Sequence, residues 1–322
     1  MSNQRIQYID IAKGIGILLV VIGHCINSLS FLGKWIWSFH MPLFFVISGL
    51  CFNPSKNTLF VPFFLKKTRT LLLPLVIFSI LMVAIKSVIF PSEFNFATLK
   101  MNFPDAAYWF IFVLFLSEIL FFSIDKITNN QYLKFILLFL CLIIGKLLNI
   151  YHIYFPYNLC SIFACTFFYG IGNIFRTTIH SILNNINTNG KSIIVSIILL
   201  LIPAVSVYYL NNTIDLRSNT IPFPILYHVL IAFIGITGIF LLSKVLSRID
   251  SLIKTITLYL GRNTLIILLL HMCFINISAN FISPLISHKI TYKIIELIFI
   301  SVLLYISIQI INHKLKWLIG KF

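Results

Sequence analysis

Residues 5–24 read RIQYIDIAKGIGILLVVIGH, a hydrophobic segment that carries the ionisable side chains of Asp10, Lys13 and His24. Such groups are costly in lipid, so their presence in or beside a membrane span indicates a functional site. Lys13 and His24 are eleven residues apart. In a helix this spacing returns to within roughly 20° of the same face, about 16 Å further along the axis. The segment therefore predicts a helix face with a cation near one membrane surface and an imidazole deep inside.

The composition of the 322-residue chain is that of a polytopic membrane protein. Hydrophobic residues make up 59% and charged residues 10%, against about 45–50% and 25% in soluble domains, and the mean hydropathy is +1.01. The longest polar stretches are short loops, so we expect a single membrane domain over residues 1–322. The net charge of +16 is scattered over these loops, which favours membrane orientation over nucleic-acid binding.

The hydrophobic segments predict an all-α polytopic protein with about ten transmembrane helices, since a bilayer core of about 30 Å needs roughly 20 apolar residues per helix. The predicted spans are 10–30, 33–52, 71–91, 107–124, 133–149, 157–176, 191–210, 223–244, 263–284 and 290–311. An even number of spans places both termini on one side of the membrane. Most lysines and arginines fall in the connections on that side, which predicts that both termini are cytoplasmic.

The sequence lacks both the cysteine patterns of metal and disulfide sites and the motifs of common soluble enzymes. The six cysteines form no CxxC pair, so we expect neither a metal site nor a disulfide framework. The chain also lacks the HExxH, P-loop and GxSxG motifs, which argues against the common soluble hydrolase and nucleotide chemistries.

A second membrane histidine is predicted at the depth of the first. His40, in the second span, lies about 10 Å below its outer end, and His24 lies about 9 Å from the outer boundary. Membrane histidines often serve only as hydrogen-bond groups between helices, but this matched depth, with Lys13 on the face of His24, favours a functional pair. Asp10 is open to two interpretations, a helix N-cap or first-turn acid and an ion-pair partner of Lys13.

Other charged groups lie inside the predicted spans or close to them. The ionisable residues within later spans are Glu118, His271 and Glu296. Each carboxylate can pair with a histidine or a cation. The segment FFLKKTRTLLLP holds Lys66, Lys67 and Arg69 just before the third span. This cluster either orients the protein and contacts lipid headgroups, or binds an anionic cytoplasmic ligand.

Four stretches together form a recognisable pattern. They are YIDIAKGIGILLVVIGH (8–24), FHMPLFFVISGLCF (39–52), KKTRTLLLP (66–74) and LGRNTLIILLLH (260–271). In this order they resemble the membrane acyltransferase-3 family, in particular its sugar O-acetylase branch with fucose 4-O-acetylase-like members. The resemblance implies about ten membrane helices in a bacterial inner membrane. It also implies transfer of an acetyl group from cytoplasmic acetyl-CoA to a hydroxyl of a cell-envelope glycan or its lipid-linked precursor.

The resemblance and the charge pattern assign roles to individual residues. The predicted catalytic residues are His24, His40 and Asp10. The predicted acetyl-CoA-binding residues are Lys13, Lys66 and Arg69. Lys13 stands where the wider family usually has arginine, and lysine keeps the charge without the bidentate fork. His24 either acts as general base on the acceptor hydroxyl or forms an acetyl-histidine intermediate.

Two other functions fit part of the pattern. A transporter or flippase of an envelope intermediate would also have about ten spans and buried ionisable groups, and it would move its substrate without coenzyme A. A non-catalytic membrane scaffold would leave the polar face of the first span unexplained.

Overall fold

A computed structural model describes residues 5–26, 29–54, 58–89, 99–100 and 102–321. The regular secondary structure over these residues is helical, apart from one isolated antiparallel β-bridge between Asp215 and Thr220. The α-helices in chain order are α1 (Gln7–Cys25), α2 (Phe31–Trp37), α3 (His40–Cys51), α4 (Phe60–Lys67), α5 (Leu73–Ile89), α6 (Tyr108–Ile127), α7 (Gln131–Ile150), α8 (Ser161–Ile174), α9 (Arg176–Asn185), α10 (Gly190–Leu210), α11 (Ile225–Arg248), α12 (Leu252–Arg262), α13 (Thr264–Ile277) and α14 (Lys289–Lys314).

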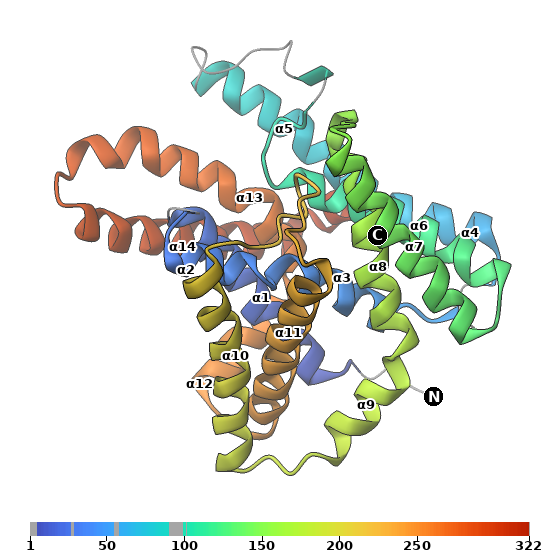
Figure 1. Cartoon of the computed structure of the whole chain (residues 1–322). Helices are drawn as coiled ribbons and strands as arrows, with labels where there is room; N and C mark the ends of the chain where they lie inside the picture. The colour runs from blue at the N-terminus through green and yellow to red at the C-terminus, as the bar shows by residue number, and fades with distance from the viewer. Residues whose placement is uncertain (1–4, 27–28, 55–57, 90–98, 101, 322) are drawn as a thin grey trace.

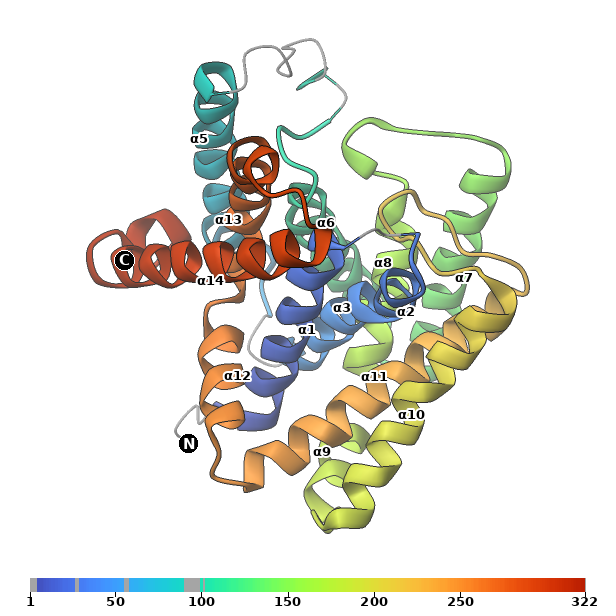
Figure 2. The ribbon, with the colours of Figure 1, turned by 90° about the vertical axis from the view of Figure 1, so that its left-hand side faces the viewer.

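Helix α1 lies at the centre of this bundle (Figures 1 and 2). It packs against α11, α12, α13 and α3, while the pairs α10–α11, α3–α8, α7–α8 and α6–α8 form the other extensive contacts. Twelve of its nineteen residues are buried. The helix predicted to carry the functional groups is therefore held by neighbours from both halves of the chain.

Seven helical segments in the described part are long and apolar enough to cross a membrane. They are Gln7–Cys25, Phe60–Ile89, Gln131–Ile150, Gly190–Leu210, Ile225–Arg248, Thr264–Leu285 and Lys289–Lys314. Each overlaps a predicted span, although Phe60–Ile89 begins eleven residues before the predicted 71–91. An eighth candidate is the pair Pro156–Ile174 and Arg176–Asn185, which is bent by 55°. The all-helical, multi-pass architecture is confirmed, whereas ten spans and cytoplasmic termini stay predictions.

The predicted span 33–52 is divided into α2 and α3. Phe39 interrupts the helix with φ −144° and ψ −17°. Its ring is fully buried, and a Cβ placed on Gly235 would lie 2.7 Å from it. His40 Nδ1 bridges the break at 2.9 Å from the carbonyl oxygen of Ile36. The burial of Phe39 against α11 therefore sets the point at which the segment changes direction.

Helix backbones approach each other closely at glycines, which have no side chain. A Cβ on Gly14 would lie 1.9 Å from the carbonyl oxygen of Thr257, in α12. A Cβ on Gly49 would lie 1.8 Å from the carbonyl oxygen of Tyr169, in α8. Small residues allow this approach between membrane helices, which associate mainly through packing. These crossings fix α1 and α3, the helices that carry most of the predicted site.

Candidate active site

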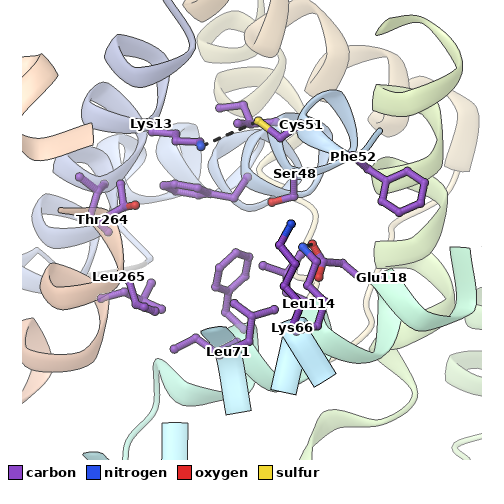
Figure 3. A pocket seen from close by; sticks show the side chains of 17 residues that line it. Lys13, Ser48, Cys51, Phe52, Lys66, Leu71, Leu114, Glu118, Thr264 and Leu265 are labelled. Carbon is purple, nitrogen blue, oxygen red and sulfur yellow. Dashed lines mark hydrogen bonds and ion pairs between the residues drawn. The ribbon is translucent and has the colours of Figure 1, made fainter. Parts of the chain in front are cut away.

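A pocket of about 320 Å³ opens between α1, α3, α4, α6 and α13 (Figure 3). We call it the lysine pocket, after its cations. The polar residues that line it are Lys13, Ser48, Cys51, Lys66, Lys67, Glu118 and Thr264. The wall is otherwise mostly aliphatic and aromatic. The structure thus brings Lys13 and Lys66, predicted from distant segments, into one pocket.

Lys67 and Glu118 form an ion pair within the lysine pocket. Lys67 Nζ lies 2.8 Å from Glu118 Oε1, and Glu118 is 3% exposed. This confirms that the Glu118 carboxylate has a cationic partner. Among the described residues, Lys13 and Lys66 take part in no ion pair, and the Lys13 ammonium lies 3.9 Å from Cys51 Sγ. Three lysines and one carboxylate leave the pocket with a surplus of two positive charges, which favours an anionic ligand.

Arg69 lies outside this lining. It belongs to a short π-helical turn, Thr68–Leu72, that joins α4 to α5. Its side chain is exposed, and its carbonyl oxygen packs against Gly320, whose φ is +70°. The predicted donor-binding set is therefore divided, with Lys13 and Lys66 in the pocket and Arg69 on the following turn.

A cluster of aromatic and imidazole rings surrounds the other end of α1. The ring centroid of His24 lies 5.3 Å from that of His271 and 6.3 Å from that of Trp37. Trp37 lies 6.0 Å from His40. We call these residues the histidine cluster. His24 and His40 therefore both lie next to one indole, and a third imidazole joins them from α13.

His271 was not predicted as a site residue. Its Nδ1 lies 3.0 Å and 2.9 Å from the carbonyl oxygens of Ile267 and Leu268. Because carbonyls only accept hydrogen bonds, Nδ1 carries the proton and Nε2 is left as an acceptor. Nε2 is buried and has no partner within the described structure. The sequence signal that was available is the position of His271 at the end of the stretch 260–271.

Asp10 lies away from the histidine cluster. It precedes His24 by fourteen residues on α1, a rise of about 21 Å. Its Oδ2 lies 3.7 Å from Nε of Arg262, so the described structure pairs Asp10 with Arg262 rather than Lys13. Asp10 therefore lies at the contact between α1 and α12, where it pairs with the last residue of α12. No group of three or more histidine, cysteine, aspartate or glutamate side chains in the described ranges could hold a metal ion.

Comparison with known proteins identifies the class. The profile of a family described as an acyltransferase domain matches residues 6–312, so the chain belongs to the acyltransferase-3 family, and its apolar helices mark it as a multi-pass membrane protein. Within a shorter region it is similar to nodulation protein NolL of Mesorhizobium japonicum, with 37% identity over 133 residues. That region is 37% of this chain and 36% of NolL, so the similarity spans about a third of either protein. No solved structure matches.

Proposed function

We propose that the protein transfers an acetyl group from acetyl-CoA to a hydroxyl of a cell-surface glycan or its lipid-linked precursor, in the inner membrane of a bacterium. The supporting observation is that α1 connects the lysine pocket, at Lys13, with the histidine cluster, at His24. The rise between the two residues is about 16 Å, comparable with the reach of a pantetheine arm. Membership in an acyltransferase family favours this function over a transporter.

The lysine pocket suits the phosphate end of coenzyme A. Lys13 and Lys66 would act as point charges on the phosphates, and Lys67 stays paired with Glu118. Arg69 extends the positive charge along the following turn. Asp10, through Arg262, would hold α1 against α12 and so fix the position of Lys13. The apolar part of the wall would accommodate the pantetheine arm.

The histidine cluster suits proton transfer. The acceptor oxygen would attack the thioester carbon while a ring nitrogen of His24 takes the hydroxyl proton. The carbon–sulfur bond then breaks, and the thiolate of coenzyme A leaves with that proton. His271 Nε2, the free acceptor, would orient His24 by accepting a hydrogen bond from its second ring nitrogen. His40 would position the acceptor hydroxyl. An acetyl-His24 intermediate is the alternative route.

Substitution of the histidines tests this function. Envelope membranes holding wild type or variants are incubated with radioactive acetyl-CoA, and acetylated glycan is counted. We expect His24→Gln to lower transfer by about a hundredfold or more with unchanged acetyl-CoA binding. His271→Gln should lower the rate while leaving the KM for acetyl-CoA unchanged, because His271 acts through His24. His313→Gln, an exposed histidine, is the matched control. Normal transfer by folded His24→Gln would refute the assignment.

A further inference from the structure

A small hollow lies beside the histidine cluster, under the connection between α10 and α11. Its volume is about 30 Å³, enough for a polar group the size of one or two waters. We call it the arginine hollow; the residues that carry its chemistry are His24, Trp37, His40, Trp109, Asp215 and Arg217. The hollow is therefore large enough for the hydroxyl-bearing edge of a ligand to reach His24, while the rest of that ligand stays outside.

The connection that covers the hollow is fixed to α7 by buried hydrogen bonds. Asn219 Nδ2 donates to the carbonyl oxygen of Gly145 at 2.6 Å. Lys146 Nζ donates to the carbonyl oxygen of Ile221 at 2.7 Å. Both bonds are buried, and the bridge between Asp215 and Thr220 closes the turn. The segment that lines the hollow is thus held in one conformation by buried hydrogen bonds.

Arg217 has a fixed backbone and an exposed side chain. Its N–H donates to Asp215 Oδ1 at 2.9 Å. Its carbonyl oxygen accepts from Asn158 Nδ2 at 2.8 Å and from Ser161 Oγ at 3.1 Å. Because the backbone is already ordered, ligand binding through this side chain does not have to order the loop as well. The guanidinium is therefore placed for recognition beside His24.

The guanidinium of Arg217 forms no ion pair in the described structure, and the one carboxylate that lines the hollow with it, that of Asp215, is bonded to the loop itself. Asp215 accepts from the N–H of Arg217 and from the N–H and hydroxyl of Ser218, and no ion pair includes Arg217. Asp105 is a buried acid within the influence of this charge. Burial raises the pKa of its carboxyl to about 6, against the opposing effects of a backbone N–H, Lys86 and Arg217. The unpaired guanidinium favours an anionic ligand at the mouth of the hollow.

We propose that the arginine hollow is the acceptor subsite, and that Arg217 binds a carboxylate or phosphate substituent of the sugar that presents its hydroxyl to His24. A guanidinium fork matches either anion in a bidentate manner. The indoles of Trp37 and Trp109 supply flat apolar surface with an N–H, suited to the face of a sugar ring. This inference rests on the proposed function and adds to it the acceptor class, a negatively charged sugar.

Binding of matched sugar pairs tests the inference. Ligand-observed NMR titrations of the protein in nanodiscs compare methyl glucuronide with methyl glucoside, and glucose 1-phosphate with glucose. We expect one charged probe to bind about tenfold more tightly than its neutral partner. Arg217→Gln should remove that preference, and Arg217→Lys should keep part of it, since the charge remains but the fork is lost. Lys289→Gln, which removes another exposed cation, should leave it intact.

The outcomes show which anion Arg217 binds, and they distinguish failure of the acceptor subsite from failure of the proposed function. Preference within the glucuronide pair identifies a carboxylate, and preference within the glucose pair identifies a phosphate. The absence of preference in wild type, or the same preference in Arg217→Gln, would overturn the inference. Acetyl-CoA binding is measured on the same samples. Acetyl-CoA binding without any sugar preference overturns only the acceptor subsite. The absence of acetyl-CoA binding overturns the proposed function.

Discussion

His24 differs from the two other imidazoles of the histidine cluster in its partners. Nδ1 of both His40 and His271 lies within hydrogen-bond distance of backbone carbonyl oxygens, which fixes their tautomers. His24 makes no such bond within the part of the chain that is described, and it is less buried than either. Its two ring nitrogens are therefore available to substrate and to His271, as a general base requires.

Asp105 predicts a dependence of stability on pH. Burial raises the pKa of its carboxyl from 3.8 to about 6, so the folded protein binds this proton more tightly than the unfolded chain. Stability from this group is present at low pH and is lost as the pH rises from about 4 through 6, by at most about 1.4 kcal/mol per pH unit. Apparent melting temperatures of wild type should rise more than those of Asp105→Asn between pH 7.5 and 5. Equal rises would contradict the buried, protonatable carboxyl.

The sequence predicts single residues best where a charge stands alone in an apolar segment. Lys13, His24, His40 and Glu118 were found in this way, because any polar group at such a position needs a reason. The ion pair between Glu118 and Lys67 joins residues 51 positions apart, so its partner is decided by tertiary packing. The contact of His271 with His24 and the place of Arg217 beside it also depend on packing, and no local pattern reveals them.

At the scale of helices, hydrophobic length predicts spans but not their interruptions. The segment 33–52 has the length and apolarity of one helix, yet it divides into α2 and α3. The break depends on the fit of Phe39 against Gly235 in α11, a contact between distant parts of the chain. The π-helical turn Thr68–Leu72 also departs from regular helical geometry. Its Leu71 lines the pocket with Lys66, whereas Arg69 lies outside the lining.

The crossing of α3 and α8 predicts the effect of a single methyl group. A Cβ on Gly172 would lie 2.2 Å from the carbonyl oxygen of Val46, so Gly172→Ala must force the two helices apart. We expect a loss of about 1–3 kcal/mol in stability, measured as a lower apparent melting temperature in nanodiscs. Gly190→Ala is the control, since no atom lies within 4 Å of a Cβ there. Equal melting of the two variants would show that the backbones are not in contact.

At the scale of the whole molecule, α1 carries the two proposed binding regions at different depths. The lysine pocket contains Lys13, and the arginine hollow contains His24. Under the proposed function, such an arrangement would allow a cytoplasmic thioester and an extracytoplasmic sugar to meet without either crossing the membrane. The sequence predicted this separation from the spacing along one helix, because helical rise converts residue number directly into depth.

The proposed orientation predicts the accessibility of the two ends of α11. Asn212→Cys and Arg248→Cys, at exposed positions on either side of this helix, are introduced into a Cys51→Ser background. We expect a membrane-impermeant maleimide to label Asn212→Cys in intact cells, and Arg248→Cys only after permeabilisation. The positive-inside rule is the physical reason, since Arg248 lies on the side that carries most cations. The reverse pattern, or labelling of both variants in intact cells, would contradict the topology.

Acetyl-CoA binding is the most direct test of the donor role of the lysine pocket, because it requires no knowledge of the acceptor. Calorimetric titration of acetyl-CoA into nanodiscs compares wild type, Lys13→Ala and the control Lys191→Ala, which removes an exposed cation outside the lysine pocket. We expect saturable binding to wild type, unchanged binding to Lys191→Ala, and about tenfold or greater weakening in Lys13→Ala. Absence of binding to folded wild type, or equal affinity for Lys13→Ala, would contradict this donor role.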